Sequence, residues 1–290
     1  MPELPEVEIV MRGLAPALTG RRISRAEVRR PDLRFPFPKD FAGRLEGRTF
    51  TGFARRAKYI LASLDDEQVL LVHLGMTGRV TVFAQDGRMD NLGEFYFEGA
   101  GGGSVHDHVV LHLDDGSRMV YTDPRRFGMM DLFAGEEAGA HRLLRNIGVE
   151  PLGNGLHADY LAAAFKGKAA PLKAALLDQG IIAGLGNIYV CEALYRAGLS
   201  PTRLARTVAT PARLDPLIRH IRDILNEAIA AGGSTLRDYA GTDGTRGSYQ
   251  QVFAAYGRAG EPCLKRGCGG TIGRIVQSAR STFHCPRCQR

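Results

Sequence analysis

Residues 261–288 have the sequence EPCLKRGCGGTIGRIVQSARSTFHCPRC, which holds four of the chain's five cysteines. These four occur in the order Cys263-x4-Cys268-x16-Cys285-x2-Cys288. The short, long, short spacing is typical of four thiolates that bind one structural Zn2+ in a tetrahedron. Two runs rich in β-forming residues, 271–276 and 280–284, flank the turn 277–279 and predict a hairpin. Two disulfides are the alternative, which an unexported chain disfavours.

The same end of the chain holds all of the net charge. The 290 residues include 38 Lys and Arg against 31 Asp and Glu, a formal net charge of +7. Residues 246–290 contain eight basic residues and one acid, Glu261, which already gives +7, so residues 1–245 sum to zero. This asymmetry indicates a polyanionic partner, most simply nucleic acid, with a solvated basic tail as the alternative.

Composition excludes several other classes of protein. Apolar residues make up 44% of the chain and nothing is repetitive, which excludes fibrous and disordered proteins. No run of about 18 apolar residues occurs, and the N-terminal sequence MPELPEVEIV lacks the basic and apolar regions of a signal peptide. We therefore expect a globular, unexported protein without a membrane segment.

The first half of the chain has the pattern of an antiparallel β protein. An opening helix is predicted from apolar residues spaced at Val7, Val10, Met11 and Leu14. Residues 22–133 then consist of short alternating runs bounded by Gly, Asp and Pro, which predict a sandwich or barrel. Residues 89–105, which contain GAGGGS, are expected to form a loop within it.

From about residue 141 the apolar period becomes helical. Helices are expected at 141–147, 159–165, 172–178, 187–197 and 212–231. Residues 240–248 (AGTDGTRGS) are expected to form a linker or loop before the cysteine-rich segment. The expected organisation is a β-sandwich domain over 1–135, a helical domain over 136–250 and a zinc finger over 255–290.

The N-terminus offers a candidate nucleophile. Removal of Met1 would leave Pro2 as a secondary amine, and an α-amino group with a pKa of roughly 7.7 to 8.0 is partly neutral at pH 7. Glu3 lies beside it and Glu6 follows in the first helical turn. A well-capped helix without a catalytic role is the alternative.

Several turns between predicted elements present side chains suited to DNA. Lys58 ends a basic run before a strand, Met76 lies between glycines in HLGMTG, and Arg125 and Phe127 lie in YTDPRRFG. Apolar side chains beside an arginine can open a base step and fill the gap. The alternatives are a solvated basic face for Lys58 and side chains folded back on the sheet for the others.

Two further motifs have more than one interpretation. His106 and His108 share one face of a strand and could bind a metal, although phosphate or packing contacts are preferred because no third ligand is evident. Asn187 follows the glycine-rich turn at 184–186 and begins a helix, where it could cap the helix or contact a phosphate.

Taken together, these motifs resemble the bacterial formamidopyrimidine-DNA glycosylase family along nearly the whole chain. They are, in order, PELPEVE, RRAKY, HLGMTG, HDHV, YTDPRRFG, LLDQGIIAGLGNIYVCEAL, YGRAGEPC and CPRC. The resemblance implies an α+β multidomain fold, with an N-terminal helix and antiparallel β sandwich, a helical domain containing a helix–two-turns–helix motif, and a C-terminal four-cysteine zinc hairpin. It implies a DNA repair enzyme that excises 8-oxoguanine and formamidopyrimidines from duplex DNA and then cleaves the strand by β,δ-elimination.

The resemblance also implies catalytic roles for four residues. Pro2 matches the nucleophile that forms a Schiff base at C1′, and Glu3 matches the acid that assists sugar-ring opening. Lys58 matches the lysine that donates a proton and contacts phosphate during β-elimination. Arg280 matches the zinc-hairpin arginine associated with δ-elimination.

Other positions match DNA contacts of the family. Met76, Arg125 and Phe127 match the three residues that fill the space left by the flipped base. Residues 235–248 match a segment that closes over that base. The remaining expected contacts are a pocket acid, Glu6, and the DNA-facing residues His73, His106, Lys168 and Asn187.

The chain departs from the family pattern in three places. The first cysteine pair has four intervening residues where two are common, a basic pair is reduced to Lys168, and the 89–105 loop is longer than the family minimum. Two other functions stay open: an endonuclease VIII-type glycosylase for oxidised pyrimidines, and a zinc-dependent DNA-binding protein without chemistry. ELPEVE and the complete Met76, Arg125 and Phe127 set argue against the former. The latter would leave Pro2 without a purpose.

The expected partner is damaged double-stranded DNA. We expect a cytoplasmic monomer associated with the nucleoid, with one structural Zn2+, no organic cofactor and no membrane association.

Overall fold

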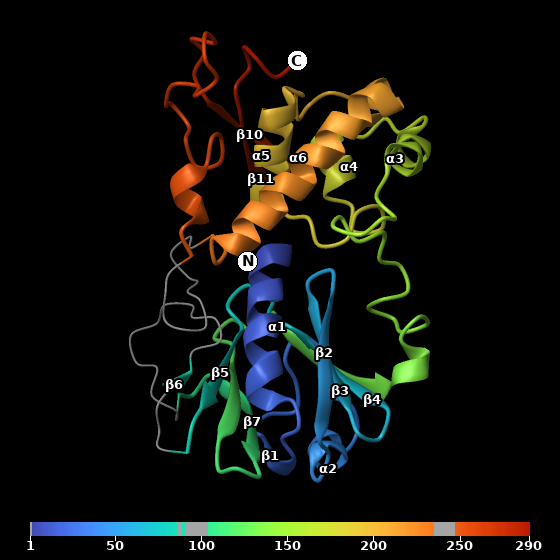
Figure 1. Ribbon diagram of the computed structural model, residues 1–290, viewed down its shortest axis with the longest axis vertical. Helices are drawn as coiled ribbons and strands as arrows, with labels where there is room; N and C mark the ends of the chain where they lie inside the picture. Colours follow the sequence, from blue (N-terminus) through green and yellow to red (C-terminus); the bar gives the residue numbers. More distant parts are fainter. Residues whose placement is uncertain (1, 86–88, 91–103, 235–246) are drawn as a thin grey trace. The chain divides into compact units, whose positions relative to one another are not determined.

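A computed structural model describes residues 2–85, 89–90, 104–234 and 247–290 (Figure 1). The chain divides into two compact units. The first unit is Met1–Arg145 with Ile229–Gln250, and the second is Asn146–Ala228 with Gln251–Arg290. In the described part of the chain, no helix is long and apolar enough to cross a membrane. The division into three domains inferred from the sequence stays a prediction.

Two antiparallel sheets and one long helix make up most of the first unit, as the β-sandwich expectation requires (Figure 1). The five-stranded sheet has the order β1-β7-β8-β5-β6. Its strands are β1 (Ile23–Val28), β5 (Arg79–Phe83), β6 (Met89–Asp90), β7 (Asp107–Leu113) and β8 (Arg118–Thr122). The four-stranded sheet has the order β2-β3-β4-β9. Its strands are β2 (Phe50–Arg56), β3 (Tyr59–Leu64), β4 (Gln68–His73) and β9 (Met129–Ala134).

The core of this unit lies between the sheets and under α1 (Leu4–Leu18). Apolar residues on one face of α1, at Val7, Val10, Leu14 and Leu18, are almost fully buried and share one cluster with residues of both sheets. This stripe is the one that the helical spacing predicts. A short helix, α2 (Phe41–Leu45), packs against β1.

Two chain crossovers link the sheets in ways that matter for the site. The segment 74–78 runs from β4 in the four-stranded sheet to β5 in the five-stranded sheet. The segment 123–128 returns from β8 to β9, again between the two sheets. The two crossovers touch, because a Cβ added to Gly75 would lie 2.4 Å from the backbone of Phe127.

Helices and a hairpin form the second unit. Its helical elements are α3 (Ala158–Phe165), α4 (Leu172–Leu176), α5 (Asn187–Ala197), the 3-10 turn η2 (Ala205–Val208) and most of α6 (Pro211–Ala230). The helices predicted at 159–165, 187–197 and 212–231 are confirmed to within a residue or two. α4 ends two residues before the expected 178. Two other 3-10 turns are η1 (Gly135–Glu137), which follows β9 in the first unit, and η3 (Tyr249–Val252), where the chain passes from the first unit to the second.

The helix predicted at 141–147 is wrong. Residues 141–147 form turns, in which the amides of Leu144 and Arg145 both donate to the carbonyl of His141, at 2.9 Å each. The chain then leaves the helical path because the Gly148 amide donates to the Gln179 carbonyl and Val149 forms a parallel bridge with Ile182. Tertiary pairing therefore overrides the local apolar period.

The cysteine-rich end contains the predicted hairpin. β10 (Gly273–Gln277) pairs with β11 (Arg280–His284), and the two turn residues Ser278 and Ala279 have φ values of 48° and 59°. Positive φ at both central residues is the geometry of a type I′ turn, which matches strand twist. Of the loop predicted at 89–105, residues 89–90 form β6 instead, and 91–103 lie outside the described residues, as do 240–246 of the predicted linker.

Candidate functional site

The start of α1 places two buried carboxylates beside Pro2. Glu3 is the N-cap residue, and its side chain accepts from the Glu6 amide while the Glu6 side chain accepts from the Glu3 amide, at 2.9 Å. Both glutamates are 3% exposed, and Pro2 is buried as well. This reciprocal capping box fixes the backbone directly after Pro2, and therefore the direction of its amine.

Glu6 has further donors on its other oxygen. The backbone amide and the hydroxyl of Ser234 lie 3.0 Å and 3.1 Å from Glu6 Oε1. Ser234 itself forms an isolated bridge with Ser248. Glu6, expected from the resemblance to be a pocket acid, therefore also ties α1 to the stretch of the same unit that follows α6.

Lys58 lies in the turn between β2 and β3 and is 8% exposed. A solvated basic face was the alternative for Lys58, but the side chain of the preceding Arg55 is only 8% exposed, and its Nε lies 2.7 Å from Glu8 Oε2 on α1. Arg55 also donates to the carbonyl of Ala57, which has a φ of 53°. Arg55 thus links α1 to the residue before Lys58.

His73, at the end of β4, is a neutral histidine. Burial, and then the positive charges of Lys58 and Arg34, lower its pKa from 6.5 to about 4. The backbone amide of Gly75 donates to His73 Nδ1 at 3.0 Å, so the ring proton is on Nε2. His73 consequently presents an N–H donor without a charge, close enough to Lys58 for the two to interact.

The two crossovers bring the predicted gap-filling residues together. Met76 lies on the segment 74–78 and is partly exposed. Arg125 and Phe127 lie on the segment 123–128 and are exposed, with the Arg125 guanidinium carbon 4.8 Å from the Phe127 ring centre. The alternative, in which these side chains fold back on a sheet, does not fit the exposure of Arg125 and Phe127.

The histidine pair at the start of β7 does not form a metal site. His108 is buried, and its Nε2 lies 2.9 Å from the Asp123 carbonyl, whereas His106 is exposed. Throughout the described ranges, the four cysteines of the finger are the one group of metal-ligating side chains close enough to share an ion. His106 remains available for a phosphate, and His108 is a packing residue.

In the second unit, a hydrogen bond from Asn187 to Ser281 joins the start of α5 to the strand that carries Arg280. Asn187 begins α5, and its Nδ2 donates to the carbonyl of Ser281 at 2.9 Å, next to the exposed Arg280. Lys168 lies 3.5 Å from Asp178 in a partly exposed ion pair of little energetic weight. The helix start and the hairpin arginine therefore form one surface of this unit.

Lys173 lies in none of the sequence motifs assigned a function, yet it is only 1% exposed. Its Nζ donates to Thr282 Oγ1 at 2.6 Å and to the Ser281 carbonyl at 3.2 Å. The charge of a buried lysine must be balanced by such acceptors. Lys173 thus holds the two residues of β11 that follow Arg280. Its place within the apolar run APLKAALL is the feature that could have drawn attention to it.

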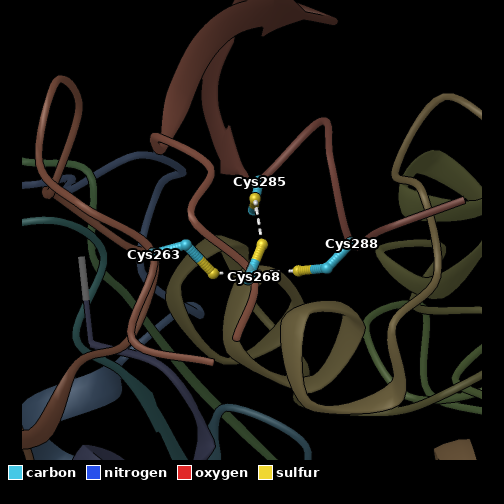
Figure 2. Close-up of side chains that lie close together, drawn as sticks. All are labelled: Cys263, Cys268, Cys285 and Cys288. Carbon is cyan, nitrogen blue, oxygen red and sulfur yellow. Dashed lines mark hydrogen bonds between the residues drawn. The ribbon is translucent and has the colours of Figure 1, made fainter. Parts of the chain in front are cut away.

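The four cysteines have the arrangement of a zinc site (Figure 2). Their sulfur atoms lie within 4.8 Å of one another, with Cys263 and Cys288 3.8 Å apart and Cys268 and Cys285 3.6 Å apart. Zn–S bonds of about 2.3 Å in a tetrahedron give sulfur separations of about 3.8 Å. None of the five cysteines is disulfide-bonded, so the disulfide alternative is wrong.

Two neighbours shape this centre. A Cβ at Gly270 would lie 2.8 Å from the sulfur of Cys285, so glycine is needed where the backbone passes the thiolates. The Tyr195 hydroxyl lies 3.2 Å from Cys263 Sγ and connects α5 to the site. The four-residue spacing of the first cysteine pair therefore still closes a four-thiolate site.

Comparison with known proteins places this geometry in a class. Three family profiles match consecutive parts of the chain: the formamidopyrimidine-DNA glycosylase N-terminal domain over residues 1–130, the formamidopyrimidine-DNA glycosylase H2TH domain over 147–240, and a zinc finger found in FPG and IleRS over 260–290. A β sandwich, a helix–two-turns–helix domain and a structural zinc finger in this order define a class of DNA repair glycosylases.

Similar proteins extend over the full chain. Formamidopyrimidine-DNA glycosylases of Ruegeria pomeroyi and Beijerinckia indica are 56% and 55% identical to it, each over 100% of both chains. The crystal structure of Lactococcus lactis Fpg with DNA containing an abasic site is 30% identical with a TM-score of 0.86 over 100% of both chains. That of Thermus thermophilus MutM (FPG) is 36% identical with a TM-score of 0.83, covering 99% and 98%.

The chain belongs to the formamidopyrimidine-DNA glycosylase family. It is a zinc-finger DNA glycosylase, and the sequence-based expectations of fold class, enzyme class and structural zinc are confirmed. The two other functions that the sequence left open are not favoured by these relatives.

Proposed function

We propose that this enzyme removes oxidised purines, 8-oxoguanine and formamidopyrimidines, from duplex DNA and then cleaves the strand at the abasic site. The observation that carries the proposal is the capping box that fixes the residue after Pro2 and keeps Glu3 and Glu6 buried beside it. The relatives named formamidopyrimidine-DNA glycosylase, and the structure of Lactococcus lactis Fpg with abasic-site DNA, support the same substrate class.

The first chemical step belongs to Pro2. With Met1 removed, its secondary amine attacks C1′ of the damaged nucleotide, the bond between C1′ and the base breaks, and the sugar ring opens. Glu3 lies next to the amine and is the group that exchanges protons with the sugar as the ring opens. The product is a cationic iminium that joins Pro2 to C1′.

The iminium explains why strand cleavage follows base removal. Its positive charge acidifies the C2′ proton, whose loss expels the 3′ phosphate in a β-elimination, and a second elimination expels the 5′ phosphate. Lys58, in the turn linked through Arg55 to α1, is assigned to proton donation and phosphate binding in the first elimination. Arg280, held by its neighbours on β11, is assigned to the second.

DNA binding divides between the two units. His73 and His106 in the first unit, and Lys168 and Asn187 in the second, are assigned to phosphate and backbone contacts. The net charge of +7 in residues 246–290 adds a sequence-independent attraction to DNA. Met76, Arg125 and Phe127 are assigned to the gap left when the lesion leaves the base stack. We place the enzyme in the cytoplasm on nucleoid DNA, as a monomer.

A comparison of lesions and variants tests the proposal. Duplexes with one 8-oxoguanine or one thymine glycol are incubated with the wild type and with Arg280→Gln, and the strand ends are resolved on a sequencing gel. The expected result is cleavage at 8-oxoguanine that leaves phosphate at both ends, and accumulation of the β-elimination product with Arg280→Gln. Preferred cleavage at thymine glycol would instead indicate the endonuclease VIII type, and binding without any cleavage would indicate a protein without chemistry.

A further inference from the structure

A buried carboxylate that the sequence motifs did not single out joins the two crossovers by hydrogen bonds. Asp123 is 0% exposed and follows β8. Its Oδ1 accepts from the Thr77 hydroxyl at 2.6 Å, and its Oδ2 accepts from the Gly128 amide at 2.8 Å. The Tyr121 hydroxyl lies 3.5 Å from Oδ2 and 3.3 Å from the His73 carbonyl, and its one proton can serve one of them at a time.

The backbone of Asp123 joins a third segment to the same point. Its amide donates to the His106 carbonyl at 3.0 Å, and its carbonyl accepts from the Arg126 amide at 3.2 Å. The same carbonyl lies 2.9 Å from His108 Nε2. Burial lowers the pKa of His108, so this ring is neutral and Nε2 is the donor. One residue therefore fixes the segments around 77, 106 and 126.

The space around Asp123 leaves no room for the crossovers to shift. A Cβ at Gly75 would lie 2.4 Å from the Phe127 carbonyl carbon, and a Cβ at Gly128 would lie 1.7 Å from the Tyr121 hydroxyl. Gly75 also has a positive φ, of 63°. The glycines allow the two backbones to touch, and the carboxylate then holds them by hydrogen bonds at the point of contact.

Thr77 extends this arrangement to the exposed side chains. Its hydroxyl donates to Asp123 and accepts from the Arg125 amide at 3.2 Å. We propose that Asp123, through Thr77, is a positioning residue that holds Met76, Arg125 and Phe127 as one preformed wedge. A wedge that is ordered before binding loses less conformational entropy when it enters the base stack. Because the inference assigns a use to this wedge, it rests on the proposed function.

The inference predicts which step depends on the Thr77 hydroxyl. Excision of a stacked 8-oxoguanine requires the base to leave the helix and the wedge to take its place. Cleavage at a preformed abasic site has no base to unstack, so it depends on the wedge much less. A defect in the wedge should therefore separate the two activities, whereas a general loss of folded protein should lower both.

The test compares Thr77→Val with Thr77→Ser, which keeps the hydroxyl. A matched control is Ser117→Ala, which removes a hydroxyl to carboxylate hydrogen bond of the same 2.6 Å length, to Asp115, at the other end of β8. For each protein, single-turnover rates are measured on 8-oxoguanine and abasic-site duplexes. The fluorescence of 2-aminopurine placed next to the lesion reports unstacking, and thermal unfolding reports stability.

We expect Thr77→Val to slow 8-oxoguanine excision about tenfold or more and abasic-site cleavage less than about threefold, with a smaller 2-aminopurine rise. Thr77→Ser and Ser117→Ala should stay close to the wild type in both rates. Asp123→Asn removes the charge but keeps the shape of the side chain. It should also slow excision more than abasic-site cleavage, and it replaces Thr77→Val in the test if that variant does not fold.

Two results would overturn the inference. The first is equal slowing of both activities in Thr77→Val and Asp123→Asn. The second is no slowing of either activity. These results are distinct from failure of the proposed function, which would appear as no excision of 8-oxoguanine by the wild type.

Discussion

Replacing His73 by asparagine should change how the stability of the enzyme responds to acid. In the folded protein the pKa of His73 is about 4, against 6.5 for an unperturbed histidine, chiefly because the ring is buried and then because Lys58 and Arg34 are nearby. The side-chain oxygen of asparagine can accept the hydrogen bond from the Gly75 amide, as His73 Nδ1 does. Asparagine, however, has no group that titrates. The variant therefore removes the titration with little change in the contacts.

The sign and size of the change in unfolding free energy with pH follow from proton linkage. Above pH 6.5 the ring is neutral in both states and its titration costs nothing. Between pH 6.5 and 4 the unfolded chain binds a proton that the folded protein excludes, so stability falls as the pH falls. From pH 7 to pH 4.5 this amounts to about 2 kcal/mol of unfolding free energy that His73→Asn should not lose.

Urea unfolding at the two pH values, followed by circular dichroism, measures this difference. Zinc release at low pH affects both proteins alike and cancels in the comparison. His106→Asn makes the same chemical change at an exposed position and serves as the control. A difference between wild type and His73→Asn that does not change with pH would refute the reasoning, as would an NMR titration of the His73 ring centred near pH 6.5.

Three other perturbations have defined outcomes. Glu6→Gln should lower the unfolding free energy by about 1–3 kcal/mol, since an amide cannot accept every donor around this carboxylate; thermal unfolding measures it against the exposed Glu137→Gln. Arg55→Met should cost about 1–3 kcal/mol, because Glu8 is only 12% exposed and keeps the exposed Arg12 as a partner, and Glu8→Gln in the same chain should restore part of that loss. A strong zinc chelator should remove one Zn2+ per chain, measured with a zinc-responsive dye, and abolish DNA binding measured by fluorescence anisotropy, while Cys191→Ser should leave the zinc content unchanged.

The fold was predictable where local sequence patterns coincide with tertiary needs. The helical stripe of α1, the alternating runs of the two sheets and the cysteine spacing each concern residues close in sequence, and each was confirmed. The segment 141–147 shows where this fails. Its apolar period suits a helix, but the hydrogen bond from Gly148 to Gln179 draws the chain away, and nothing local encodes that partner.

The residue types of the site were predictable from the sequence, but the buried residues that hold them in place were less so. The motif resemblance brought forward Pro2, Glu3 and Lys58 together with residues that the structure finds on touching crossovers. It did not bring forward Asp123 or the burial of Arg55, because their roles depend on partners 46 and 47 residues away in the chain. A buried charge can be recognised only when the surrounding elements are in place.

The central claim is that the amine of Pro2 forms a covalent bond with the damaged nucleotide. Borohydride reduction during reaction with a duplex that carries one 8-oxoguanine opposite cytosine should trap this intermediate, and mass spectrometry should locate it. The account predicts a cross-link on Pro2 with Met1 absent, and no trapping for a chain that carries an extra N-terminal residue. A cross-link on another residue, or undiminished trapping and cleavage by the blocked chain, would contradict it.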